Sequence, residues 1–320
     1  MEDNKKISFL GDGFDDGSDN SSSPKSESPT GNVKEQIAYL KSKATNYIFL
    51  FGQQGSGKSV VSSSLIYHLM NDTRGVLRVI RSESNADGER FATKIQTLIE
   101  NGDFPDRTKA GTVTQVDLHY TPHDKSKKPI YVTLLEMSGE TLRDVSIDER
   151  DKGKGKLPHN IDVFFLTGGL SMLFILVTST DKARQDVSLI NQFLDYIVQK
   201  DNKFYNSNII LLISKWDKNM GIEKIEQFVE RNLKSVYTKI FRPNAQNAII
   251  PYKIGDVTPI PDTDSEGKEF YRDYIQSFDH HSPELLWNWI YKSITGEFLI
   301  SPPKEEELSW WGNIRKWLLG

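Results

Sequence analysis

The residues best suited to chemistry lie in the stretch FGQQGSGKSV, at residues 51–60. Its three glycines and its Lys-Ser pair fit the spacing G-x-x-x-x-G-K-[ST]. In that motif backbone N–H groups cradle phosphates, the lysine reaches the β- and γ-phosphates, and the hydroxyl binds Mg²⁺. The stretch therefore predicts a nucleoside triphosphate site. The expected nucleotide contacts are Gly52, Gly55, Ser56, Gly57, Lys58, Ser59 and Val60, with Ser59 also a metal ligand.

A second polar group, Ser214-Lys215-Trp216-Asp217, directly follows the apolar run NIILLI. A carboxylate can accept both ring-edge donors of guanine in one bidentate pair, and adenine has no matching edge. Asp217 is placed for that contact, and the stem of Lys215 can lie over the base. A helix start that Ser214 or Asp217 merely caps is the alternative. The buried strand before the group and the phosphate loop upstream favour the guanine site.

A third group, Glu136-Met137-Ser138-Gly139, directly follows the apolar run YVTLL. A carboxylate at a strand end can hold water on Mg²⁺, and a glycine three residues later lets its backbone N–H approach the γ-phosphate. A simple turn between strand and loop is the alternative. Glu136 is thus a candidate metal residue, and Gly139 a candidate phosphate contact.

The rest of the chain must bring these three groups to one edge of a sheet, where open α/β sheets bind ligands. Strands are expected at residues 47–51, 76–80, 113–120, 130–135, 172–177, 208–213 and 248–252, and helices at 59–69, 85–100, 187–197, 222–240 and from 282. Strands that alternate with helices predict an α/β fold. We expect the three-layer P-loop NTPase fold, with a mainly parallel sheet and one antiparallel hairpin strand.

Composition excludes several functions. The net charge of −4 implies no broad basic face for nucleic acid. The absence of cysteine excludes disulfides, thiolate zinc sites and a cysteine nucleophile. The N-terminus has no secretory apolar core, so a cytoplasmic protein is expected. The uncharged run at residues 163–177 approaches the length of a membrane span. A Gly-Gly pair breaks it, which favours a helix end followed by a buried strand.

The chain divides into three parts by composition. Residues 1–32 are acidic and rich in serine, and we expect a disordered tail. Residues 33–300 are the predicted P-loop domain. Residues 301–320 form a separate Trp-rich amphipathic segment. That segment can fold back on the domain, dock on a partner protein or, as the least expected alternative, lie on a membrane surface.

On the motifs GQQGSGKS, EMSG and SKWD, in this order, the chain resembles a Ras-like P-loop GTPase of the translation-factor-related (TRAFAC) class over roughly residues 45–254. More faintly, it is similar to bacterial GTPases encoded as neighbouring pairs. The resemblance implies GTP and GDP as ligands together with Mg²⁺, and slow GTP hydrolysis coupled to a molecular switch. It also implies a regulatory or effector protein as partner, with self-association or a second GTPase as alternatives.

The resemblance also assigns roles to residues outside the three motifs. It implies a switch I threonine that binds Mg²⁺ when the γ-phosphate is present. Thr108 is favoured for this role over Thr112 and Thr114, which are expected in a strand. For the loop that contacts the base after the last strand, the candidate is Tyr252 with the two residues that follow it.

Departures from the family pattern bear on hydrolysis. Glu136 stands where the family has Asp, and Ser214 where it has Asn or Thr. Glu140 replaces the catalytic glutamine after the switch II glycine, and Gln54 replaces a glycine of Ras. The candidate catalytic residues are therefore Gln54, Glu140 and Lys58. A scaffold that binds nucleotide without hydrolysing it remains an alternative, and so does an ATP-using P-loop enzyme.

Overall fold

Helices and strands alternate along most of the chain in the computed structural model, which describes residues 33–80, 86–105, 113–137, 159–200, 208–219, 223–241, 247–264 and 267–301. The helices are α1 (Val33–Ser42), α2 (Lys58–Met70), α3 (Ala86–Glu100), α4 (His159–Leu166), α5 (Ala183–Lys200), α6 (Ile225–Ile240) and α7 (His281–Thr295). The strands are β1 (Asn46–Phe51), β2 (Gly75–Val79), β3 (Val113–Pro122), β4 (Ile130–Met137), β5 (Met172–Ser179), β6 (Ile209–Ser214), β7 (Ala248–Pro251), β8 (Gly255–Thr263) and β9 (Glu269–Phe278).

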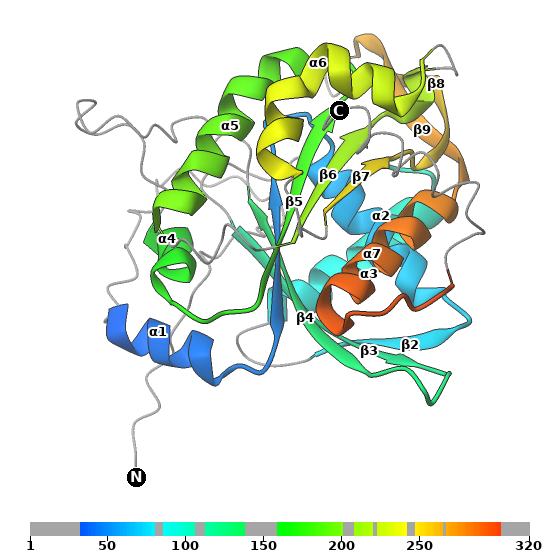
Figure 1. The fold of residues 1–320 in the computed structure, drawn as a ribbon. Helices are drawn as coiled ribbons and strands as arrows, with labels where there is room; N and C mark the ends of the chain where they lie inside the picture. The colour runs from blue at the N-terminus through cyan, green and yellow to red at the C-terminus, as the bar shows by residue number, and fades with distance from the viewer. Residues whose placement is uncertain are drawn as a thin grey trace, which may run out of the picture.

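Seven of the strands form one sheet in the order β2-β3-β4-β1-β5-β6-β7 (Figure 1). β1 pairs in parallel with β4 and with β5, and the parallel pairing continues through β6 to β7. β3 runs antiparallel to both of its neighbours, β2 and β4. The predicted α/β fold, with a mainly parallel sheet and one antiparallel strand, is confirmed.

Helices cover both faces of this sheet (Figure 1). α1, α4, α5 and α6 seal one apolar core, and α2, α3 and α7 seal the other. Phe49 and Phe51 of β1 point into the first core, while Ile48 and Leu50 point into the second. Since successive side chains of a strand face opposite sides, a strand covered on both faces must be apolar throughout. This explains the uninterrupted apolar runs in the sequence.

The uncharged run at residues 163–177 divides between two elements. Its first part ends α4, its last part lies in β5, and Gly169 takes a left-handed conformation (φ 87°) between them. All eight residues of β5 are buried. In the described part of the chain, no helix combines the length and the apolar character needed to cross a bilayer.

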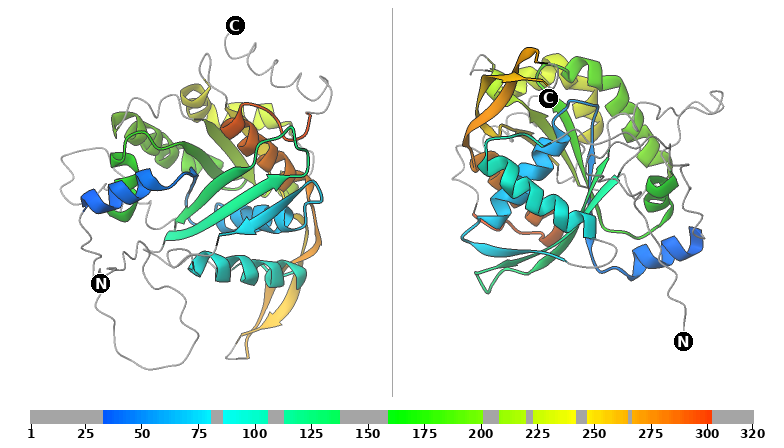
Figure 2. Two further views of the ribbon diagram at one scale, coloured as in Figure 1. Left: turned by 90° about the horizontal axis from the view of Figure 1, so that it is seen from below. Right: turned by 180° about the vertical axis from the view of Figure 1, so that it is seen from behind.

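A hairpin of β8 and β9 stands apart from the main sheet and runs beside the end of α3 (Figure 2). Sequence analysis did not predict these strands. β8 contains Pro259 and Pro261, and proline within a run argues against a strand. The hairpin tolerates them because many of its residues are exposed, including Tyr271 at 75%.

The hairpin is fixed to the segment that follows α3. The backbone N–H of Ile275 donates to the carbonyl of Gly102 (2.7 Å). Gly102 has φ 76°, and a side chain there would collide with the ring of Tyr274. Arg272 forms an ion pair with Asp103. The hairpin therefore holds the chain at the point where it leaves α3.

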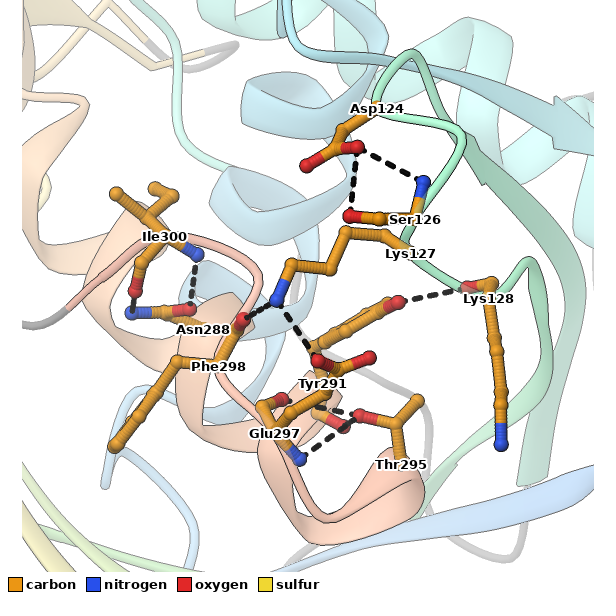
Figure 3. A network of polar contacts seen from close by, with 10 residues as sticks. All are labelled: Asp124, Ser126, Lys127, Lys128, Asn288, Tyr291, Thr295, Glu297, Phe298 and Ile300. Atoms are coloured by element: carbon orange, nitrogen blue, oxygen red, sulfur yellow. Dashed lines mark hydrogen bonds and ion pairs between the residues drawn. The ribbon is translucent and has the colours of Figure 1, made fainter.

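A polar network ties the turn between β3 and β4 to the end of α7 (Figure 3). The ammonium of Lys127 donates to Glu297 (3.0 Å) and to the carbonyl of Phe298 (2.8 Å). The hydroxyl of Tyr291 donates to the carbonyl of Lys128 (2.8 Å). These contacts fix α7, the last helix described, against the antiparallel edge of the sheet.

The first core is centred on aromatic rings directly beneath β1. Phe193 of α5 stacks on Phe51, with ring centroids 3.8 Å apart, and meets Phe165 and Phe174 edge to face. Phe51 is the last residue of β1, so this packing supports the start of the phosphate loop.

We expect Phe193→Ala to lower the free energy of unfolding by about 3–5 kcal/mol, because it removes a fully buried ring and leaves a cavity. Urea unfolding followed by circular dichroism measures this change. The matched control is Tyr271→Ala on the exposed face of the hairpin, which should change the free energy by less than about 0.5 kcal/mol. Equal effects of the two substitutions would contradict the packing described.

Candidate functional site

The phosphate loop, residues 52–57, joins β1 to α2. Gly55 (φ 77°) and Gly57 (φ 92°) take left-handed conformations that side chains disfavour. Gly52 lies so close to β5 that a Cβ atom would come within 2.2 Å of the carbonyl oxygen of Val177. Backbone geometry therefore requires all three glycines. The first N–H groups of α2, which have no partner within the helix, border the loop and suit an anion.

The ammonium of Lys58 folds back over this loop. It donates to the carbonyl oxygens of Gly52 (2.8 Å) and Gln53 (3.0 Å), and the residue is only 6% exposed. Burial lowers the pKa of Lys58 to about 8, against the opposing effect of the carboxylates of Glu136 and Asp186. The lysine of the motif is thus held at the loop by the loop's own backbone.

Glu136, at the end of β4, meets two hydroxyls of α2. Ser59 donates to one carboxylate oxygen, and Ser62 donates to the other at 2.6 Å. The structure therefore brings together Ser59 and Glu136, the two predicted metal residues that it describes. Sequence analysis missed Ser62, although it lies three residues after Ser59 and so on the same face of the helix. The described residues contain no cluster of three or more metal-binding His, Cys, Asp or Glu side chains.

The SKWD segment begins at the end of β6 and is bonded to the phosphate loop. The hydroxyl of Ser214 donates to the carbonyl of Ser56 at 2.6 Å, and Ser214 is buried. Lys215 has φ 56°, and its ammonium pairs with Asp181 at 3.1 Å. Asp217 is exposed, on a short 3-10 helix at Trp216–Asn219. The left-handed backbone of Lys215 is strained for a residue other than glycine, and strained residues of this kind cluster at functional sites.

Tyr252 does not present its side chain to this site. It is 1% exposed, and its hydroxyl lies 2.5 Å from that of Ser64 in the core beneath α2. Burial raises the pKa of Tyr252. Only its backbone borders the SKWD segment, since its carbonyl accepts the N–H of Trp216 (3.1 Å). Tyr252, predicted with the next two residues for the loop that contacts the base, thus borders the SKWD segment with its backbone and places its side chain in the core.

The residue after Tyr252 is closer to the expected base position. The ammonium of Lys253 pairs with Asp279 at 3.0 Å, and this hydrogen bond raises the pKa of Lys253. A smaller contribution comes from the charge of Asp217. Lys253 is thus near enough to Asp217 for their charges to interact.

A second lysine at the phosphate loop was missed by sequence analysis. Lys182 lies between β5 and α5, and its ammonium donates to the carbonyl of Gln54 at 2.9 Å. A Cβ atom on Gly55 would stand 2.8 Å from the same ammonium. No motif spacing signals this contact, because the two residues meet only through the parallel pairing of β1 with β5.

Other predicted residues fall outside the part of the chain that the structure describes. These are Thr108, Gly139 and Glu140, together with Thr112 and both terminal segments, 1–32 and 302–320. Gln54 lies in the phosphate loop, and Val60 lies in the first turn of α2.

No protein-family model matches the chain, and no curated protein is significantly similar to it in sequence. Among solved structures, the signal recognition particle receptor SRb-GTP/SRX complex from Chaetomium thermophilum is similar at 13% identity. The match covers 66% of this chain and 94% of that chain, with a TM-score of 0.35. A likeness this slight assigns no function to this chain.

The bond between Ser214 and Ser56 gives a direct test of how the site is held together. Ser214→Ala should lower the free energy of unfolding by about 1 kcal/mol, because a buried carbonyl loses its donor. Hydrogen exchange at the amides of residues 54–58 should become faster. Ser188→Ala, an exposed serine of α5, is the control and should change neither quantity appreciably. Indistinguishable results for the two variants would show that the bond does not hold the loop.

Proposed function

We propose that the chain is a guanine-nucleotide-binding protein that hydrolyses GTP slowly and acts as a switch for a regulatory or effector protein. One observation carries the proposal: the hydroxyl of Ser214 is bonded to the carbonyl of Ser56 at 2.6 Å. This bond joins the segment suited to guanine to the loop suited to phosphates. A single nucleotide can therefore contact both.

The base is assigned from the chemistry of the SKWD segment. Asp217 is exposed on the short 3-10 helix that follows β6, with a carboxylate that can accept two donors at once. The guanine edge offers two such donors, and adenine offers no matching pair. Lys215 is held beside this position by Asp181 and presents its aliphatic stem.

The residues at the end of β4 and the start of α2 fit a magnesium ion. Mg²⁺ takes oxygen ligands and usually keeps several waters, with few contacts from protein. The Ser59 hydroxyl would bind it directly, and the Glu136 carboxylate would hold one of its waters. When bound, the ion neutralises charge on the β- and γ-phosphate oxygens. The pairing of both Ser59 and Ser62 with Glu136 supports an oxygen-rich site.

Hydrolysis of GTP bonds a water oxygen to the γ-phosphorus and breaks the bond to the bridging oxygen. The electron pair remains on GDP, and the proton of the water is released with inorganic phosphate. Gln54 carries an amide in the phosphate loop that can orient this water, while Glu140 is a carboxylate in the place of the family's glutamine. Added negative charge at that place disfavours catalysis, so we infer a slow reaction.

A nucleotide-binding scaffold that does not hydrolyse GTP is the second candidate. The same carboxylate, Glu140, favours it. A protein partner and a cytoplasmic location belong to both candidates.

Base choice is the sharpest test of the proposal. The wild type should bind GTP and GDP with Mg²⁺ and reject ATP. Asp217→Asn should weaken guanine binding by at least about ten-fold and favour xanthine nucleotides. The amide of asparagine offers a donor where the aspartate accepted, and xanthine carries a carbonyl where guanine carries an amino group. Competition against a fluorescent guanine nucleotide measures both. Asp195→Asn, an exposed carboxylate of α5 paired with Lys239, is the control. Equal competition by ATP and GTP would refute the guanine assignment.

The rate of hydrolysis separates the two candidates. We expect dilute protein to turn over GTP at about 10⁻⁴ to 10⁻³ per second, the range of an unassisted Ras-like enzyme. Steady-state phosphate release measures this rate. Gln54→Gly should change the rate more than the affinity for GTP, because its amide acts on the water. Tight binding without phosphate release would favour the scaffold, and turnover of about one per second would contradict a slow enzyme.

A further inference from the structure

Lys182 reaches the phosphate loop from a segment far away in the sequence. Its ammonium donates to the carbonyl of Gln54 at 2.9 Å, and a Cβ atom on Gly55 would stand 2.8 Å from it. No sequence motif assigns this residue a role. Its position places a second positive charge beside a loop that already holds Lys58.

The backbone of Lys182 is fixed at the start of α5. Its N–H donates to the carbonyl of Ser179 (3.0 Å), and its own carbonyl accepts the N–H groups of Gln185 (2.9 Å) and Asp186 (3.0 Å). Only the four-carbon stem is therefore free to move the ammonium. The backbone of Lys182 therefore keeps its place beside the loop as long as the first turn of α5 is intact.

Lys58 and Lys182 make the same kind of contact. Together they donate to three consecutive carbonyls of one loop, those of Gly52, Gln53 and Gln54. Lys58 is the residue of the motif that reaches the β- and γ-phosphates. Its ammonium thus marks where the outer phosphates are expected, and the carbonyl bound by Lys182 is the next one along the loop.

An ammonium has three donors, and among the described residues Lys182 uses one of them, on Gln54. A charged phosphate oxygen accepts a hydrogen bond from an ammonium more strongly than a neutral carbonyl does. Lys182 can therefore keep its bond to the loop and still donate to a phosphate.

A buried acidic side chain, that of Asp186, lies near both lysines. Asp186 is 1% exposed, and its Oδ2 accepts the hydroxyl of Thr178 at 2.6 Å. Its Oδ1 is buried without a hydrogen-bond partner within the described chain. Burial raises the pKa of Asp186, while the Thr178 hydroxyl and the charges of Lys182 and Lys58 act against this. Asp186 is thus close enough to both ammonium groups for their charges to interact.

We propose that Lys182 is a second phosphate-binding cation, which contacts the γ-phosphate and supplies from within the chain the positive charge that phosphoryl transfer requires. This inference rests on the proposed function. As the bond between the γ-phosphorus and the bridging oxygen breaks, negative charge grows on the departing GDP and on the transferred group. Lys182 stabilises that charge and neither gains nor loses a proton in the step.

The test compares a triphosphate with a diphosphate. GDP and a non-hydrolysable GTP analogue are titrated with Mg²⁺ into the wild type, Lys182→Gln, Lys182→Arg and the control Lys239→Gln, a lysine paired with Asp195 on the outer surface. Lys182→Gln should lower the affinity for the analogue by about ten- to hundred-fold and leave the affinity for GDP within about two-fold of the wild type. Single-turnover phosphate release should slow by at least about ten-fold. Lys182→Arg should keep most of the affinity for the analogue and most of the single-turnover rate. Lys239→Gln should match the wild type in both quantities.

Other results would each separate the role of Lys182 from the proposed function. An equal loss for GDP and the analogue, or no loss, would show that Lys182 only anchors the loop, and the proposed function would stand. Wild-type binding of ATP and GTP analogues alike would refute the guanine assignment, while the di- against triphosphate comparison would still judge Lys182. A wild type that binds no nucleotide would overturn both. If Lys182→Gln unfolds because Asp186 loses a neighbouring cation, the double variant with Asp186→Asn, compared with Asp186→Asn alone, gives the same comparison.

Discussion

The parallel register of β1, β5 and β6 is the constraint on which the site depends. Phe51 lies beside Leu176, and Ser179 lies beside Ser214, so these strands end at one edge of the sheet. The phosphate loop, the turn that carries Lys182 and the SKWD segment therefore leave the sheet side by side. Without that alignment, a hydroxyl could not bond to a carbonyl 158 residues earlier in the chain, as Ser214 does. A rigid, buried ladder fixes the relative positions of groups that no local sequence could hold together.

Charge is the second feature that organises the site. Lys58 and Lys182 both donate to carbonyls of the loop, and Glu136 and Asp186 are buried near enough to Lys58 for their charges to interact. Burying a charge costs several kcal/mol unless it is paired and hydrogen-bonded. Here the carboxylates accept hydroxyls from α2 and β5, and the ammonium groups donate to backbone carbonyls. The arrangement keeps two cations close together where an anion with several negative charges would be stabilised most.

Sequence reasoning predicted the fold because buried parallel strands are apolar throughout, and it located the phosphate loop and the SKWD segment at strand ends because the spacing of each motif is local. It failed where the signal was not local. Lys182 has no partner within its own segment, so its role follows only from the pairing of strands. The strands of the hairpin were hidden by two prolines and by exposure on both faces. Tyr252 was predictable in principle, since it continues the alternation of Ala248 and Ile250, which face the core beneath α2.

The unpredicted hairpin joins two ends of the candidate site. It begins just after Lys253 and ends just before Asp279, and these two residues pair at 3.0 Å beside the expected base position. Farther along, its backbone bonds to Gly102, at the start of the segment that precedes β3. The two strands of the hairpin pair from Gly255 and Phe278 to Thr263 and Glu269, with one irregularity between Asp256 and Val257. The base side of the site and the root of the segment expected to contain switch I are therefore attached to one hairpin, which connects the Lys253–Asp279 pair to the backbone contact at Gly102.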